Sequence, residues 1–304
     1  MIYTLTFSPS LDYYLDVPAF KDGAINRSVK EKYVAGGKGI NVSLVLKELN
    51  YKSITLGFIA GFTGKELTRR LSTKGIPTDF VETKGNTRIN VKINSDRESA
   101  INANGPDISK KEIDELFKKL DNIKGGDILA IGGNIPNSLP KDMYLRIMEF
   151  LDGRNIKIIV DATGELLLST LRYHPFLIKP NQEELEELVK RKLNSSEEII
   201  DAAKQLIEMG ARNIIISRGG HGAIMIDENG NIYNKPATTG KMKSTVGAGD
   251  SLVGGFIAGY LKYGNYEDAL ELGIAAGSAT AFSNYISSKN KILEIYNHIR
   301  KRKE

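Results

Sequence analysis

The sequence predicts an α/β protein with a mostly parallel central sheet. Short apolar runs alternate with longer segments of helical periodicity, which is the order expected when crossover helices join parallel strands. The runs 128–131 and 157–160 are almost entirely apolar, as strands are when both faces of their sheet are covered. With 304 residues, of which 41% are hydrophobic and 26% charged, the chain can bury a large core without a metal or disulfide.

The individual elements follow from these two periodicities. Strands are predicted at residues 2–7, 53–59, 128–131, 157–160, 176–179, 213–217 and 223–227. Helices are predicted at residues 40–49, 65–74, 110–120, 141–151, 183–190, 197–209 and 251–263. Ser109 and Glu112 have the spacing of a capping box at the start of helix 110–120. Residues 272–288 carry no charge and are predicted as a buried helix.

Two segments break this alternation. Residues 11–34 are extended and rich in aromatic side chains, and residues 88–102 alternate with period two. Such alternation is typical of an antiparallel sheet with one wet face. We therefore expect residues 1–304 to form one domain with two inserted lid segments, at about 11–34 and 86–104. This small sheet would serve as a lid or as an oligomer interface.

Composition excludes several classes of protein. The chain has no cysteine, which excludes a disulfide scaffold, a cysteine-ligated metal centre and a thiol nucleophile. The net charge is +5, but four basic residues gather at 300–303 and no sustained basic stripe indicates a nucleic-acid partner. No apolar run reaches the length of a membrane span, and no secretory leader is apparent. The expectation is a cytoplasmic protein without a nucleic-acid or membrane partner.

The strongest motif is Thr245-Val246-Gly247-Ala248-Gly249-Asp250-Ser251, directly before an apolar helix. Glycines at a helix start let the first backbone N–H groups point at one anion. Asp250 then falls in the first turn of the helix. It is either a general base beside a phosphate or a carboxylate that stabilises the helix dipole, and the spacing favours neither.

Competing glycine motifs are absent. The dinucleotide fingerprint requires a third glycine where Leu252 stands, and no G-x-x-x-x-G-K-[ST] occurs. A nicotinamide dehydrogenase and a Walker-type NTPase are therefore disfavoured.

Three further motifs contain candidate ligand residues. Gly36-Gly37-Lys38-Gly39-Ile40-Asn41 opens a helix, so backbone and ammonium can approach a polar ligand. Lys179-Pro180-Asn181-Gln182-Glu183-Glu184 ends a strand, and its Asn181 and Glu184 suit either a helix cap or a metal-bound water. Ser217-Arg218-Gly219-Gly220-His221-Gly222 lies between two strands and is otherwise a plain glycine hairpin.

Together these four motifs resemble the PfkB family of ribokinase-like carbohydrate kinases over nearly the whole chain. Segments 6–12, 26–28 and 87–93 further resemble the 1-phosphofructokinase branch, with tagatose-6-phosphate kinases as the alternative. The resemblance implies a three-layer α/β/α domain with a β lid that often forms a homodimer. It also implies a phosphorylated ketohexose as substrate, and ATP and Mg²⁺ as donor and cofactor.

The resemblance also implies roles for particular residues. Asp250 would be the general base, and the N–H groups of Gly247, Ala248 and Gly249 the anion hole. The nucleotide would be bound by Lys179, Asn181, Ser217, Gly219 and Gly222, with Glu184 at Mg²⁺ through water. The sugar phosphate would be bound by Asp12, Arg27, Gly37, Lys38, Asn41, Arg88 and Asn90, the cations Lys38 and Arg88 meeting its phosphate.

Two alternatives belong to other classes. A non-catalytic sugar-phosphate sensor would need no base, so the presence of Asp250 disfavours it. A nucleoside kinase is disfavoured by the two cations expected on the sugar side. One departure from the family pattern is Ser244, where many members carry an aspartate of a monovalent-cation site.

Overall fold

The central sheet determines the shape of the molecule. The structure, a computed structural model, describes residues 1–301, so the last three residues of the basic tail lie outside the described residues. Nine strands run in the order β13-β12-β11-β10-β9-β8-β1-β4-β5, and all are parallel to their neighbours except in the β11–β12 and β12–β13 pairs. Their bounds are β1 Ile2–Thr6, β4 Ile54–Ala60, β5 Val81–Thr83, β8 Ile128–Gly132, β9 Lys157–Asp161, β10 Leu177–Ile178, β11 Ile214–Ser217, β12 Ala223–Ile226 and β13 Ile232–Lys235.

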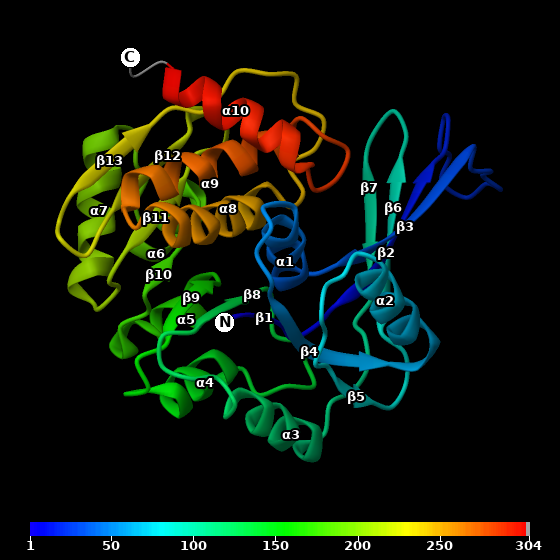
Figure 1. The fold of residues 1–304 in the computed structure, drawn as a ribbon. Coiled ribbons are helices and arrows are strands. Elements are labelled where there is room, and N and C mark those ends of the chain that lie inside the picture. The colour runs from blue at the N-terminus through cyan, green and yellow to red at the C-terminus, as the bar shows by residue number, and fades with distance from the viewer. Residues whose placement is uncertain (302–304) are drawn as a thin grey trace.

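Helices cover both faces of this sheet (Figure 1). One layer contains α1 (Lys38–Glu48), α8 (Ala248–Tyr263), α9 (Tyr266–Ala281) and α10 (Lys289–Lys301). The other contains α3 (Lys110–Leu120), α4 (Met143–Leu151), α5 (Gly164–Leu168), α6 (Gln182–Val189) and α7 (Ser196–Glu208).

Alternate residues of one strand serve the two layers. In β8, Ile128 and Ala130 pack in the core beneath α8 and α9, whereas Leu129 and Ile131 pack in the core beneath α3 and α4. The sheet is therefore buried on both faces. This arrangement confirms the predicted three-layer α/β/α fold with a mostly parallel sheet.

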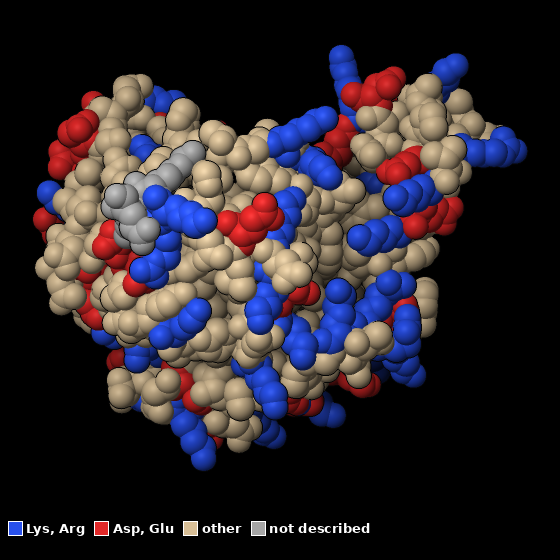
Figure 2. Space-filling model, turned by 45° about the horizontal axis from the view of Figure 1, so that its top comes forward, with Lys and Arg blue, Asp and Glu red and all other residues tan. Residues whose placement is uncertain are grey.

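A second sheet projects from the body (Figures 1 and 2). Its order is β3-β2-β6-β7, with bounds β2 Ser10–Asp16, β3 Lys30–Gly36, β6 Arg88–Asn94 and β7 Ser99–Asn102. Helix α2 (Gly61–Thr73) lies between β4 and β5 in the chain. The small sheet is not purely antiparallel as predicted, because β2 and β6 are parallel. Its wet face is also not uniform, since Asn90 on the polar side of β6 is buried against Asp12.

Most predicted elements are present with small shifts in their ends, and α3 begins with the Ser109–Glu112 capping box. The predicted helix over residues 272–288 is wrong in its second half, because α9 ends at Ala281. Hydroxyl groups explain the stop: Oγ1 of Thr280 accepts a hydrogen bond from the backbone N–H of Ser287, and Oγ of Ser283 donates to the Ala279 carbonyl. Within residues 1–301, no helix combines the length and apolarity needed to cross a membrane.

Candidate active site

The glycine-rich start of α8 presents backbone N–H groups. Gly247 caps the helix with φ 77°, a conformation that favours glycine. The N–H of Ala248 donates to the Thr245 carbonyl at 3.2 Å. Among the described residues, the N–H groups of Gly247 and Gly249 have no backbone acceptor. Unpaired N–H groups at the positive end of a helix dipole are the kind of donors that bind anions.

Asp250 lies in the first turn of α8 and is buried, with 7% of its surface exposed. Its Oδ2 accepts a 2.7 Å hydrogen bond from Nδ2 of Asn41 in α1. Burial, and then the charge of Asp161, raise the pKa of Asp250 to about 6, against the attraction of Lys38, Asn41 and Lys179. A carboxylate whose pKa lies this close to neutral can accept a proton under physiological conditions.

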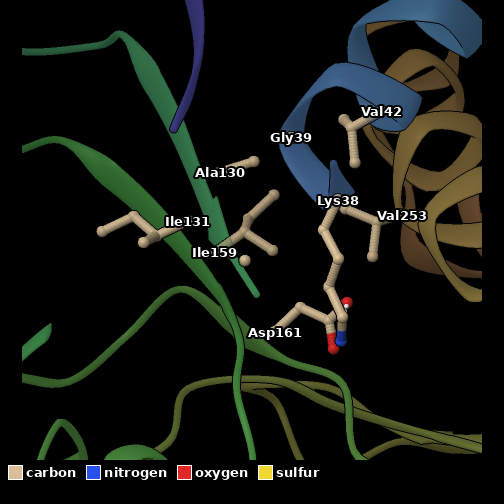
Figure 3. Close-up of a pocket in the computed structure, with 9 residues that line it drawn as sticks. Lys38, Gly39, Val42, Ala130, Ile131, Ile159, Asp161 and Val253 are labelled. Atoms are coloured by element: carbon tan, nitrogen blue, oxygen red, sulfur yellow. Dashed lines mark ion pairs between the residues drawn. The ribbon is translucent and has the colours of Figure 1, made fainter. Parts of the chain in front are cut away.

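Asp161 at the end of β9 forms ion pairs with two lysines. Its Oδ2 lies 3.1 Å from Nζ of Lys38, and its Oδ1 lies 3.3 Å from Nζ of Lys179. Figure 3 shows the side chain of Lys38 extending from the first turn of α1 to Asp161. Burial opposes the charge of Asp161, but Lys179 and Lys38 lower its pKa, so it is ionised.

Sequence reasoning missed Asp161. The available signal was a lone acidic residue following the apolar run 157–160, at the carboxyl end of a parallel strand where such sheets bind ligands. The predicted strand ended one residue too early to include it.

The cleft around these groups has a volume of about 1400 Å³. Its walls include many of the residues predicted for the base, the anion hole and the nucleotide: Asp250, Gly247, Ala248, Gly249, Lys179, Asn181, Glu184, Ser217, Gly219 and Gly222. Lys38 and Asp161 also line it. The fold thus brings residues from four separated motifs to one side of the sheet.

Asn181 and Glu184 form a reciprocal helix cap at the start of α6. Oδ1 of Asn181 accepts from the Glu184 N–H at 2.8 Å, and Oε2 of Glu184 accepts from the Asn181 N–H at 2.7 Å. Both side chains also line the cleft. The capping role is therefore present in the structure, and it uses Oε2 of Glu184 but not Oε1.

A second group of predicted residues lies where the small sheet joins the body. Oδ1 of Asp12 accepts hydrogen bonds from Oγ of Ser10 at 2.7 Å and from Nδ2 of Asn90 at 2.9 Å. Nη2 of Arg88 donates to the Ser8 carbonyl at 2.9 Å, while its Nε is buried without a partner. Gly36 abuts Asp12 so closely that a Cβ on it would lie 2.5 Å from Oδ2.

Three cations were expected on the sugar side, namely Lys38, Arg88 and Arg27, and the structure gives each a different environment. Lys38 and Arg88, both expected at the phosphate of the sugar, have different charged neighbours: Nζ of Lys38 lies beside Asp161 on the cleft side, whereas the charge nearest in effect to Arg88 is that of Asp12. Arg27 is exposed in the connection between β2 and β3, at the outer end of the small sheet. Along β2, the six residues after Ser10, at about 3.3 Å each, separate that end from Ser10. Within one copy of the chain, Arg27 therefore does not join the other sugar-side residues.

Comparison with known proteins shows which family the chain belongs to. The model of the pfkB family carbohydrate kinases matches residues 7–291. The chain belongs to this family. Its members are phosphotransferases that act on a hydroxyl group, and the kinase activity implies ATP as a substrate.

Individual relatives are similar over almost their full length. The 1-phosphofructokinase of Bacillus subtilis is 41% identical over 97% of both chains. The D-tagatose-1-phosphate kinase of Bacillus licheniformis is 39% identical over 96% of both chains. The crystal structure of phosphofructokinase-2 from Escherichia coli in complex with substrates and products has a TM-score of 0.93 at 29% identity, covering 98% of this chain and 99% of that one.

Proposed function

We propose that this PfkB kinase is a 1-phosphofructokinase, which transfers the γ-phosphoryl group of ATP to the C6 hydroxyl of fructose-1-phosphate. The observation that carries this proposal is the buried Asp250 beside the N–H groups that start α8, in a large cleft lined by lysines. The similarity to the Bacillus subtilis 1-phosphofructokinase supports the choice of substrate.

In this mechanism Asp250 accepts the proton of the sugar hydroxyl as the hydroxyl attacks the phosphoryl group. Asn41 holds Oδ2 of Asp250 by a hydrogen bond, so the proton is assigned to Oδ1. The N–H groups of Gly247 and Gly249 stabilise the charge that develops on the transferred group, and Ala248 contributes if its weak bond to Thr245 opens. Since phosphoryl transfer has a loose transition state, this positioning supplies most of the catalysis.

Lys38, Asp161 and Lys179 support the same step. A Cβ placed on Gly249 would lie 3.4 Å from Nζ of Lys179, so this ammonium is next to the anion site. Asp161 holds both lysines at fixed positions and offsets part of their charge. We assign Lys179 to the phosphates of ATP and Lys38 to the transferred group, in place of the sugar-phosphate role predicted for Lys38.

The residues present fit Mg²⁺. This ion is usually bound by one or two carboxylates, water and substrate phosphates. Within the described residues, no group of three or more acidic or histidine side chains could hold a metal alone. Glu184 lines the cleft and uses Oε2 for the helix cap, so its Oε1 would hold the ion through water, with Asn181 beside it. Bound there, Mg²⁺ would neutralise charge on the phosphates.

The sugar phosphate is assigned to the base of the small sheet. Asp12, Asn90, Asn41 and the backbone at Gly37 offer the mixed donors and acceptors that sugar hydroxyls need. Arg88, with its Nε buried and unpartnered, is the cation for the phosphate that the sugar already carries. On this view the small sheet is a lid on a single catalytic domain.

D-tagatose-1-phosphate is the second candidate substrate, because one relative is named for it. An ATP- and Mg²⁺-dependent assay should compare fructose-1-phosphate, tagatose-1-phosphate, fructose-6-phosphate, tagatose-6-phosphate and unphosphorylated sugars. The proposal expects the highest kcat/KM for fructose-1-phosphate. A higher value for a tagatose phosphate would reassign the substrate, and no turnover with any of the panel would contradict the kinase assignment.

We also propose a cytoplasmic homodimer formed through the lids. The small sheet and its connections expose apolar side chains at Ile25, Val29 and Ile101, with 86%, 73% and 64% of their surface accessible. Analytical ultracentrifugation should give a dimer, and Ile101→Lys should shift it toward monomer. A wild-type monomer at assay concentration would contradict this proposal.

A further inference from the structure

The turn between α9 and α10, residues 282–288, contacts both halves of the site. At its start, the carbonyl of Ala281 accepts hydrogen bonds from the N–H groups of Lys243 and Ser244, just before the glycine-rich start of α8. The ring of Phe282 packs against Gly240, which lines the cleft. Nζ of Lys291 in α10 donates to the Phe282 carbonyl at 2.7 Å and so fixes the turn.

Tyr285 of this turn reaches the base of the lid. Its hydroxyl donates a 2.8 Å hydrogen bond to the carbonyl of Ala35, 250 residues earlier in the chain. Burial, followed by the negative charge of Asp12, raises the pKa of Tyr285, so the hydroxyl remains a donor throughout the physiological range. Nζ of Lys32 in β3 lies 5.1 Å from the centre of the ring.

The backbone at Ala35 is tightly constrained by its neighbours. In the β2–β3 pair it lies opposite Leu11, and the next residue, Gly36, abuts Asp12 with no space for a side chain. The chain then passes through Gly37 into α1. A shift of the Ala35 carbonyl would therefore displace Asp12 on one side and the start of α1 on the other.

Ile286, the next residue, contacts the catalytic half of the site. A Cβ on Gly247 would meet Cδ1 of Ile286 at 3.2 Å and Nδ2 of Asn41 at 3.6 Å. Tyr285 and Ile286 also pack against the small core that contains Ala35 and Ile40. Two adjacent residues of one turn thus contact the sugar side and the phosphoryl-transfer side.

We propose that Tyr285 is a positioning residue for the kinase reaction: its hydroxyl fixes the Ala35 carbonyl, and through it the setting of Gly36 and Asp12 relative to the glycine-rich start of α8. The inference rests on the proposed function, since it places the sugar phosphate at Asp12. It assigns no chemical step to Tyr285. Its effect is on the affinity for the sugar phosphate, while the binding of ATP is left intact.

The test is Tyr285→Phe, which keeps the ring and removes only the hydroxyl. We expect KM for the sugar phosphate to rise about fivefold to thirtyfold, the effect of leaving one buried carbonyl unsatisfied. KM for ATP should change less than twofold. The matched control is Tyr233→Phe, because the Tyr233 hydroxyl donates to Oδ2 of Asp227 at 3.0 Å on the β12–β13 hairpin. Lys32→Met, which removes the cation beside the ring but keeps the hydroxyl, should leave both KM values unchanged.

The melting temperature of each variant separates positioning from folding. A purely structural hydroxyl would lower the melting temperature while leaving KM for the sugar phosphate unchanged, or would raise both KM values equally; either result overturns the inference. The wild-type enzyme is first assayed on the sugar-phosphate panel. Absence of turnover there contradicts the proposed function, whereas an active wild type with an unaltered Tyr285→Phe variant contradicts only the role of Tyr285.

Discussion

Asn41 donates a 2.7 Å hydrogen bond from its side-chain amide to Oδ2 of Asp250, which joins the first turns of α1 and α8 across 209 residues of sequence. This bond lowers the pKa of Asp250, whereas burial and Asp161 raise it, and the net value is about 6. Asn41→Ala should therefore raise the pKa of Asp250 further. We expect kcat/KM to fall more at pH 6 than at pH 8.

The control for Asn41→Ala is Asn94→Ala. Asn94 makes the same type of bond, from Nδ2 to Oδ1 of Asp16 at 3.0 Å, in the exposed part of the small sheet. Asn94→Ala should leave the pH profile of kcat/KM unchanged. A parallel loss at both pH values for Asn41→Ala would show that Asn41 binds substrate without affecting the titration of Asp250.

In the wild-type enzyme, kcat/KM should fall as the pH drops below about 6, because Asp250 becomes protonated and can no longer accept the proton of the hydroxyl. The substrate phosphate also titrates near pH 6. The contribution of the substrate phosphate is the same for every variant. The difference between variants in the pH dependence of kcat/KM, measured from pH 5 to pH 9, therefore reports on Asp250.

Asp161→Asn should lower the pKa of Asp250, because the charge of Asp161 raises it. The acidic limb, which is the fall of kcat/KM at low pH, should therefore move to lower pH, whereas Asn41→Ala should move it to higher pH. Asp161→Asn should also reduce the free energy of unfolding by about 3–5 kcal/mol at pH 7, since the buried Lys179 loses its partner. The pKa of Asp161 is lower in the folded state than in the unfolded state. The loss of unfolding free energy in the variant should therefore be complete above the unfolded-state pKa, and it should diminish as the pH falls through the folded-state pKa.

The matched control is Asp142→Asn, which breaks an exposed pair with Arg146 in α4 and should change stability by less than about 1 kcal/mol. Equal stability changes for the two variants, or an unshifted acidic limb in Asp161→Asn, would contradict the role given to Asp161.

Arg88→Ala should raise KM for the sugar phosphate much more than KM for ATP. Loss of one charge-assisted contact costs on the order of 2 kcal/mol, which corresponds to tens-fold in KM. Arg146→Ala on the surface of α4 is the control. Because Arg88 also donates to the Ser8 carbonyl, an equal rise for both substrates would show that it only supports the backbone.

The sequence was sufficient for most of the elements and for the four motifs, because local periodicity and glycine-rich turns carry that information. It was insufficient for contacts made in space. In the sequence Asp161 is only the acidic residue after an apolar strand, and its ion pairs with Lys38 and Lys179 are visible only in the folded structure. The family resemblance implies that Lys38 meets the phosphate of the sugar, but the direction of its side chain from α1 to Asp161 is set by tertiary packing.

The turn after α9 shows the same limit. An uncharged stretch over residues 272–288 has the composition of a buried helix, and only the hydrogen bonds of Thr280 and Ser283 show where the helix ends. The contact between Tyr285 and Ala35 links residues 250 positions apart, so no local pattern could have indicated it.

The most direct test of the account is kcat of Asp250→Asn, measured with ATP binding and melting temperature on the same preparation. Asparagine keeps the size of the side chain but cannot accept the proton, so kcat should fall about 10²–10⁴-fold while ATP still binds. Since burial raises the pKa of Asp250 in the folded state, the ionised carboxylate weakens the fold as the pH rises through about 6, and the variant should be at least as stable as the wild type at pH 8. A kcat near the wild-type value in a folded, ATP-binding variant would contradict the assignment of Asp250 as the general base.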